Sequence, residues 1–347
     1  MEQLRLLKGR TISRQSNFTV EPGARGLSED VGNGRLFARG EDPCLEWALL
    51  SDPGKLRPRN EDYAAHSLVT ASTHLDDERA TVLVVADGLG GLSAGDRASR
   101  IAVESVISYL KSEKVVNAYQ AVRKAIRQAN STILEEMAVV HGLRMGTTMT
   151  IMVATKGEAV FGHVGDSRAY LLRGNAITQL TADHSQAAEM LRMGLITPEQ
   201  ARTHPSRSQL TRCLGGDLVV RVDMLSQPLN SGDWVVLCSD GLWNLVSKQE
   251  IAHTIRDAEI TYRSKPDTES LLGHFPVPFE HQLLFGRDLL TQAKSSATQV
   301  VTQLVALALD RGAHDNVTVA AVRFMRETSM SNRGKTGLLW RRVRRRR

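Results

Sequence analysis

Short apolar segments joined by tight turns constrain the fold of this chain more than any other feature. Residues 147–154 and 159–164 are rich in β-branched and other apolar side chains, with only a short turn between them. Residues 169–172 and 177–180 repeat this arrangement across Gly174-Asn175. Strands that follow one another so closely pair as hairpins, so the pattern predicts antiparallel sheets rather than parallel βαβ units.

Helical periodicity separates these strands from the other apolar parts of the chain. Apolar side chains recur at helical spacing over residues 95–110, 115–137 and 297–309, which predicts three amphipathic helices. Two further apolar runs, at residues 82–86 and 234–238, are too short for helices and indicate buried strands. The chain is therefore expected to mix helices with antiparallel sheets.

Four acidic sites share one local pattern, in which an acid stands beside an apolar strand with glycine, asparagine or a second acid adjacent. They are Glu61-Asp62, Asp87-Gly88, Asp240-Gly241 and Asp315-Asn316. A single aspartate in such a place is commonly a turn or cap residue. Several carboxylates at one sheet edge, however, cannot all stay ionised without a cation. Oxygen ligands favour Mg²⁺ or Mn²⁺ over Zn²⁺, so the repeated pattern indicates a divalent-metal site.

The net charge of +6 is confined to the end of the chain. Residues 329–347 hold eight of the 44 basic residues and no acid, which leaves 36 basic against 38 acidic residues in the body. A body with that balance is not a nucleic-acid-binding surface by charge, and no sequence-specific nucleic-acid partner is expected. The basic tail could bind an anionic membrane, a nucleic acid or an acidic partner protein, or remain a solvated tail.

Cysteine usage and the absence of long apolar runs bear on the cellular compartment. Cys44, Cys213 and Cys238 are too few and too scattered for a disulfide framework. No apolar run approaches the roughly 18 residues of a membrane span, and the N-terminus has no apolar stretch typical of a secretory signal. A cytoplasmic location is therefore expected. Cys238 lies on an apolar run, which favours a buried, inert thiol over a nucleophile.

Six stretches of the chain resemble the metal-dependent protein serine/threonine phosphatases of the type 2C family, in their bacterial form. A single stretch would be weak evidence, but all six occur in the family's order between about Glu46 and Arg326. The matching stretches are Ser51–Asp62 (SDPGKLRPRNED), Val85–Gly91 (VADGLGG), Gly146–Thr148 (GTT), Gly165–Arg168 (GDSR), Cys238–Leu242 (CSDGL) and His314–Thr318 (HDNVT).

The resemblance implies an α+β fold, a four-layer α/β/β/α sandwich of two antiparallel sheets flanked by helices, with metals at one end. It implies that Asp87 bridges two manganese or magnesium ions, with the carbonyl of Gly88 as a further ligand. Asp240 and Asp315 would complete the first metal site.

Three further residues near the first acidic pair receive roles from the same resemblance. Glu61 would bind metal directly or through water. Asp62 would bind metal in the same way, or it would contact the metal ligands without binding metal itself. Arg57 would hold the phosphate of the substrate, because a guanidinium suits phosphate oxygens.

The implied reaction is hydrolysis of phosphoserine and phosphothreonine on proteins by direct attack of a metal-bridging water. A serine/threonine kinase would act in opposition. Bacterial members bind a third metal, and the matching positions are Asp166, Asp240 and Ser208. Some members have a histidine proposed as general acid where this chain has Leu89.

The domain organisation follows from the same match. We expect a partly disordered arm over residues 1–45, a phosphatase domain over 46–326 and the basic tail over 327–347. Within the domain, a mobile flap would cover about 181–214, and an insertion would cover about 257–290. A monomer is expected.

Two other functional classes stay open at this stage. The chain could be a catalytically inactive relative that acts as a binding module, although intact Arg57, Asp87, Asp240 and Asp315 favour an enzyme. A nucleic-acid-binding protein is supported only by the tail. Among the histidines, His163 is interpreted as a packed core residue, and His184 in the flap as a solvated loop residue.

Overall fold

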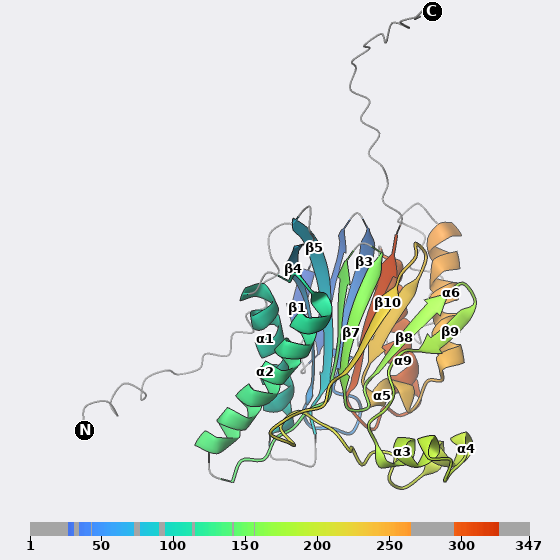
Figure 1. The fold of residues 1–347 in the computed structure, drawn as a ribbon. Coiled ribbons are helices and arrows are strands. Elements are labelled where there is room, and N and C mark those ends of the chain that lie inside the picture. Colours follow the sequence, from blue (N-terminus) through green and yellow to red (C-terminus); the bar gives the residue numbers. More distant parts are fainter. Residues whose placement is uncertain are drawn as a thin grey trace, which may run out of the picture.

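The computed structural model describes residues 27–30, 35–42, 44–72, 77–89, 94–112, 115–140, 142–155, 157–264 and 295–325. These residues form two antiparallel sheets that pack face to face (Figure 1). The five-stranded sheet has the order β10-β7-β6-β5-β4 and the seven-stranded sheet the order β1-β2-β3-β12-β11-β8-β9.

The strands of the five-stranded sheet are β4 (Asp62–Ser72), β5 (Asp77–Asp87), β6 (Met149–Thr155), β7 (Glu158–Val164) and β10 (Asp223–Pro228). Those of the seven-stranded sheet are β1 (Leu27–Asp30), β2 (Leu36–Asp42), β3 (Leu45–Asp52), β8 (Arg168–Arg173), β9 (Ala176–Gln179), β11 (Trp234–Cys238) and β12 (Val317–Phe324). Every pairing is antiparallel, as the closely spaced hairpins predict.

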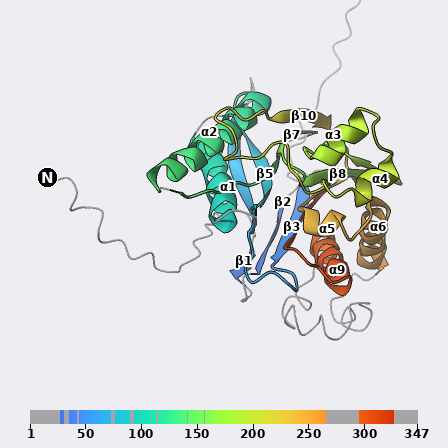
Figure 2. The same ribbon diagram turned by 90° about the horizontal axis from the view of Figure 1, so that it is seen from below.

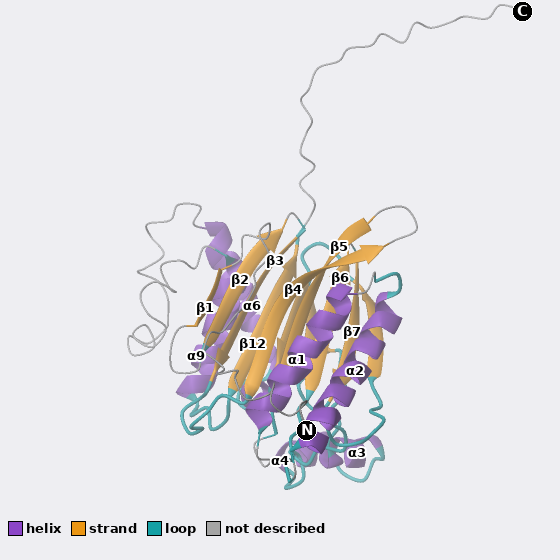
Figure 3. Ribbon diagram, turned by 90° about the vertical axis from the view of Figure 1, so that its left-hand side faces the viewer, coloured by secondary structure: helices purple, strands orange, loops and turns teal. Residues whose placement is uncertain are grey.

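Helices cover both outer faces of the paired sheets (Figure 2). α1 (Gly95–Ser112) and α2 (Ala118–Val139) lie on the five-stranded sheet, and α5 (Asp240–Trp243), α6 (Lys248–Ser264) and α9 (Ser296–Asp310) lie on the seven-stranded sheet. The short helices α3 (Gln186–Arg192) and α4 (Pro198–Thr203) lie beyond one end of the strands (Figure 3). The expected four-layer α/β/β/α sandwich is thus confirmed.

Three apolar layers hold the sandwich together. Leu83 and Phe161 of one sheet meet Leu237 of the other in the central layer. Ile126 of α2 belongs to the layer under α1 and α2, and Leu304 of α9 to the layer on the opposite side. Burial of such side chains stabilises the folded state by about 25 cal/mol per Å² of apolar surface. Because both sheets are packed into these layers, the ends of their strands are held in fixed positions.

Strand direction brings the acidic sites of both sheets to the same end of the sandwich. β4 begins at Asp62 and β5 ends at Asp87, and these two residues are register partners. In the other sheet, β11 ends immediately before Ser239-Asp240, and β12 begins shortly after Asp315. α3, α4 and α5 lie at this end in Figure 1.

Two expected boundaries need correction. Residues 27–30 and 36–42 form strands at the edge of the seven-stranded sheet, so the arm predicted over residues 1–45 is partly a component of the domain. α6 continues to Ser264, so residues 257–264 are helix rather than insertion. Residues 1–26, the rest of the predicted insertion and the basic tail over 327–347 lie outside the described residues. In the described part of the chain, no helix has the length and apolarity needed to span a bilayer.

Candidate active site at one end of the sandwich

Asp62 lies between the two sheets and joins them by hydrogen bonds. Its Oδ2 accepts hydrogen bonds from Ser239 Oγ and Thr318 Oγ1, each at 2.7 Å. Because both hydroxyl groups come from the seven-stranded sheet side, they connect the end of β11 and the start of β12 to β4. This side chain therefore aligns the two sheet ends that carry the other acidic residues.

The donors in this network can be assigned from its chemistry. Thr318 Oγ1 donates its only proton to Asp62, so in its 2.7 Å contact with Ser51 Oγ it is the acceptor. Ser51 Oγ accepts in turn from Asn60 Nδ2 at 2.9 Å. A continuous chain of hydrogen bonds thus runs from Asn60 to the buried Asp62 carboxylate, and each of these hydrogen bonds favours the ionised form of Asp62.

The backbone of Asp87 is held by the threonine pair that precedes β6. Asp87 N donates to Thr148 Oγ1 at 3.0 Å, and Thr148 N donates to the Asp87 carbonyl at 2.8 Å. Thr147 Oγ1 donates to the same carbonyl at 2.8 Å. This clamp fixes the point at which the chain leaves β5.

Gly88 and Gly241 occupy positions where a side chain has no room. A Cβ on Gly88 would lie 2.3 Å from the Gly95 carbonyl oxygen, and one on Gly241 would lie 1.9 Å from the Asn316 carbonyl oxygen. Gly88 N also donates to the Glu61 carbonyl at 3.1 Å. Close backbone approach explains why glycine follows the acid at both sites.

Asn316 joins the remaining acidic segments. Its side-chain oxygen accepts from Glu61 N at 2.8 Å, and its side-chain nitrogen donates to the Pro53 and Arg59 carbonyl groups. One residue earlier, the carboxylate of Asp315 pairs with Arg57 NH2 at 2.7 Å. The structure therefore brings Arg57 against a predicted metal ligand at the mouth of the site.

Burial and mutual repulsion shift the pKa values of the clustered carboxyl groups upward. Burial, with Asp62 and Asp240 nearby, raises the pKa of Asp87 well above its usual range. Burial also raises the pKa of Asp62 to about 7, although its hydrogen bonds to Thr318 and Ser239 oppose the shift. For Asp240, burial and the neighbouring Asp315 raise the pKa to about 6. These shifts show that negative charge is concentrated here.

The chemistry of this donor set fits a hard divalent cation, although its geometry is not that of a ready site. In the described part of the chain, no three His, Cys, Asp or Glu side chains are gathered so as to hold a metal ion directly. Asp315 is instead engaged by Arg57. The donors are nevertheless all oxygen atoms, and they are crowded enough to raise one another's pKa values. Such a set suits Mg²⁺ or Mn²⁺.

Of the three residues predicted for a third metal, Asp240 belongs to the cluster, Asp166 lies near it and Ser208 does not. Burial, and next the charge of Asp240, raise the pKa of Asp166 well above its usual range. The Asp166 carbonyl accepts from the indole nitrogen of Trp243 at 3.0 Å. Ser208 is exposed in the flap, and no contact joins it to these carboxylates within the described residues.

The flap histidine His184 is not solvated, contrary to the sequence-based interpretation. Its side chain is fully buried, its Nδ1 accepts from Gly165 N at 3.1 Å, and its Nε2 lies 3.1 Å from Asp223 Oδ2. It thereby ties the start of the flap to the loop that carries Asp166. By contrast, His163 is a packed core residue as predicted, hydrogen-bonded to Thr150.

Cys238 is buried, as expected for an inert thiol, and burial raises its pKa to about 12. Sequence reasoning missed the residues that organise the carboxylates, namely Ser239, Thr318 and Thr148. Each lies inside a stretch that resembles the type 2C family, but a hydroxyl residue in or beside a strand gives no local sign that it contacts an acidic residue from another segment.

A cluster of crowded carboxylates beside an arginine, at one end of an α/β/β/α sandwich, suits metal-assisted hydrolysis of a phosphoryl group. Comparison with known proteins specifies the class of enzyme. The family model for protein phosphatase 2C matches residues 59–271. Protein phosphatase PhpP of Streptococcus pneumoniae is 32% identical over 227 residues, which cover 65% of this chain and 89% of PhpP. The serine/threonine phosphatase stp of Listeria monocytogenes is 34% identical over 213 residues, or 59% of this chain and 81% of stp.

Solved structures agree with this assignment. The serine/threonine phosphatase PstP/Ppp of Mycobacterium tuberculosis has a TM-score of 0.62 at 28% identity, covering 82% of this chain and 100% of that chain. The catalytic domain of PstP in complex with two manganese ions has a TM-score of 0.61 at 27% identity, covering 82% and 99%. The chain belongs to the protein phosphatase 2C family and is a protein serine/threonine phosphatase of the bacterial type.

Proposed function

We propose that the carboxylate cluster is the metal centre at which this phosphatase hydrolyses phosphoserine and phosphothreonine. In this proposal, Asp87 bridges two divalent cations, manganese or magnesium, with the Gly88 carbonyl as a further ligand. Asp240 and Asp315 complete the first cation site, and Glu61 binds directly or through water. When bound, the ions neutralise the carboxylates, polarise the phosphoryl group and activate the attacking water.

The observation that carries this proposal is the convergence of carboxylates from four separate segments on one end of the sandwich. Asp62 and Asp87 face each other across β4 and β5, and the charges of Asp240 and Asp315 both act on Asp87. Burying this many carboxylates together is unfavourable unless cations compensate them. The manganese ions in the structure of the relative PstP support manganese as one such cation.

The chain's own residues position the groups that react. The threonine clamp on the Asp87 backbone and the donor chain to Asp62 hold both carboxylates in place before substrate arrives. Arg57 is about 39% exposed at the mouth, where its remaining donors can hold the phosphate oxygens of a substrate. Asp62 and the Asp87 backbone therefore need no rearrangement during reaction, whereas Asp315 would have to part from Arg57 to bind a cation.

A third cation site at Asp166 and Asp240 is part of the proposal. Support comes from the burial of Asp166 and from the effect of the Asp240 charge on it. The part assigned to Ser208 stays a prediction, because that side chain is exposed in the flap.

The wider cellular role is proposed on the basis of the family and the sequence. The enzyme would oppose a serine/threonine kinase on phosphorylated proteins and act in the cytoplasm as a monomer. The phosphatase domain would extend to about residue 326 and would include the strands β1 and β2. The basic tail over 327–347 would contact an anionic membrane or an acidic partner.

Hydrolysis of a phosphothreonine peptide tests this assignment. We expect phosphate release with Mn²⁺ or Mg²⁺, none with excess chelator, and a loss of at least about 100-fold in Asp240→Ala, because electrostatic groups of this kind contribute several kcal/mol. Asp257→Ala is the matched control, because Asp257 is exposed on α6 and pairs only with His253 in the described structure. Equal turnover of Asp240→Ala and the wild type would refute the assignment.

A further inference from the structure

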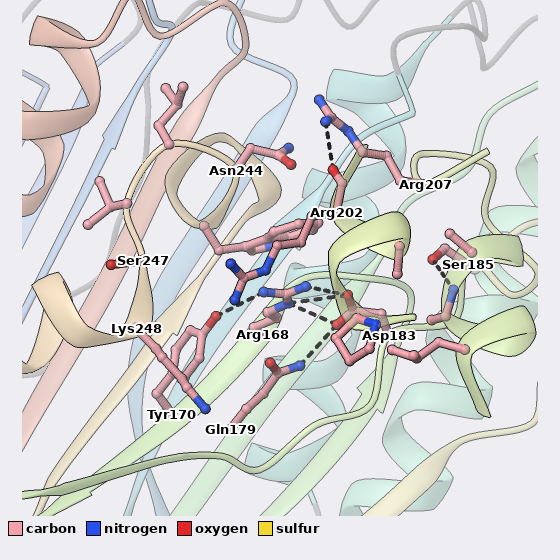
Figure 4. Close-up of a pocket in the computed structure, with 18 of the residues that line it drawn as sticks. Arg168, Tyr170, Gln179, Asp183, Ser185, Arg202, Arg207, Asn244, Ser247 and Lys248 are labelled. Carbon is pink, nitrogen blue, oxygen red and sulfur yellow. Dashed lines mark hydrogen bonds and ion pairs between the residues drawn. The ribbon is translucent and has the colours of Figure 1, made fainter. Parts of the chain in front are cut away.

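A pocket of about 440 Å³ lies beside the candidate metal centre, between the flap and the start of α6. α3 and α4 of the flap form one wall, the segment from Trp243 to Glu250 forms another, and β8 contributes Arg168 and Tyr170 (Figure 4). None of the metal ligands proposed above lines it. The pocket is therefore a separate feature of the surface next to the reacting groups.

Two residues belong both to the pocket wall and to the surroundings of the carboxylates. Asn244 lines the pocket, and its Nδ2 lies 3.2 Å from Asp240 Oδ2. Trp243 also lines the pocket, and its indole nitrogen donates to the Asp166 carbonyl at 3.0 Å. A phosphorylated residue at the metal centre would thus place neighbouring residues of the same peptide within reach of the pocket.

The two carboxylates that line the pocket are already neutralised. Asp183 accepts hydrogen bonds from Arg168 at 2.6 and 2.9 Å, and Gln179 donates to it at 3.1 Å (Figure 4). Glu250 is paired with Arg311 and accepts the backbone N–H of Ser247 at 2.9 Å, as in an N-terminal capping box. Neither carboxylate is left to attract a basic ligand.

Two cationic side chains, in contrast, are available to a ligand. Arg202 extends from α4 across the pocket, and Lys248 lies on the opposite side at the start of α6 (Figure 4). Both are exposed, and among the described residues neither forms an ion pair with a carboxylate. Glu199, one turn before Arg202 on α4, is fully exposed, and the charge of Arg202 is the smallest of the effects on its pKa. The guanidinium of Arg207 points away from the centre of the pocket and donates to the Arg202 carbonyl.

We infer that this pocket binds an acidic side chain of the phosphoprotein substrate, within a few residues of the phosphorylated serine or threonine. The inference rests on the phosphatase function and adds a substrate preference to it. Arg202 and Lys248 would pair with the carboxylate from two sides, while the partly exposed Trp243 would pack against the aliphatic part of the peptide. An acidic flank would be selected over a basic one, which the two cations would repel.

Two phosphothreonine peptides that differ only in their flanks test the inference with the full-length enzyme and Mn²⁺. One peptide has glutamates on both sides of the phosphothreonine and the other has alanines. We expect kcat/KM to be about tenfold higher for the acidic peptide, because two partly exposed ion pairs are involved. In Lys248→Glu the ratio of the two kcat/KM values should fall to about one or below, and in Arg202→Gln it should fall part of the way.

The variants are chosen so that misfolding does not explain the result. Lys248→Glu places an acid in the first turn of α6, where the helix dipole favours it. The matched control is Lys124→Glu, the same charge change at an exposed site on α2, which should keep the wild-type ratio. No preference for the acidic peptide in the wild type, or an unchanged ratio in Lys248→Glu, would overturn the inference. Turnover of p-nitrophenyl phosphate distinguishes these outcomes from a failure of the phosphatase itself, which would abolish it.

Discussion

Replacement of Thr318 by valine should destabilise the protein through the buried carboxylate of Asp62. Valine keeps the shape of the threonine side chain, which is fully buried in β12, but it removes the hydroxyl that donates to Asp62 Oδ2 at 2.7 Å. A hydrogen bond to a charged group contributes about 1.5–3 kcal/mol, and the change also leaves the Ser51 hydroxyl without its acceptor. We therefore expect the free energy of unfolding to fall by about 3 kcal/mol.

Urea denaturation at pH 8 with chelator present measures this loss where Asp62 is mostly ionised. The cost should be smaller at pH 5, because Asp62 has a pKa of about 7 and its protonated form no longer depends on the lost donor. Thr302→Val is the matched control, because the Thr302 hydroxyl bonds the neutral Thr298 carbonyl at 2.8 Å inside α9, and its loss should cost about 1 kcal/mol. Equal losses of unfolding free energy in the two variants, independent of pH, would show that the Thr318 hydroxyl does not stabilise the ionised Asp62 carboxylate.

Two further predictions concern the histidine core and the glycine at the metal centre. Burial lowers the pKa of His163 to about 3, so the contribution of His163 to stability is complete above about pH 6.5 and is lost as the pH falls toward 3. When the pH is lowered from 7 to 5, the free energy of unfolding should therefore fall by about 2 kcal/mol less in His163→Asn than in the wild type. Parallel pH profiles of the two proteins in urea titrations would contradict this. Gly241→Ala forces a Cβ to within 1.9 Å of the Asn316 carbonyl oxygen and should abolish peptide dephosphorylation. Gly157→Ala, in open space at a φ of +81°, should cost only about 1–2 kcal/mol of stability and keep the activity.

Local patterns were sufficient to predict the elements that surround the site. The run that ends at Asp87 forms β5, the periodic stretch after it forms α1, and the closely spaced hairpins pair antiparallel. These features are encoded within a few residues of one another, by alternation, helical spacing and turns. The acids at the strand ends could be recognised for the same reason.

Long-range contacts could not be read from local patterns. Residues 36–42 form a strand because they pair with β1 and β3, although their own sequence shows little periodicity. His184 is buried because Gly165 and Asp223 supply partners from other segments. Likewise, nothing next to Thr318 in sequence indicates that it faces Asp62, 256 residues away. Such positions are determined by how the two sheets pack together.

Binding of Mn²⁺ to the wild type and to Asp87→Asn, followed by titration calorimetry, tests whether the carboxylate cluster is the metal centre. We expect at least two Mn²⁺ ions per wild-type chain and loss of tight binding in Asp87→Asn. Asp96→Asn, which changes an acid of the nearby first turn of α1, should bind as the wild type does. Unchanged stoichiometry and affinity in Asp87→Asn would contradict the claim that the carboxylate cluster is the metal centre.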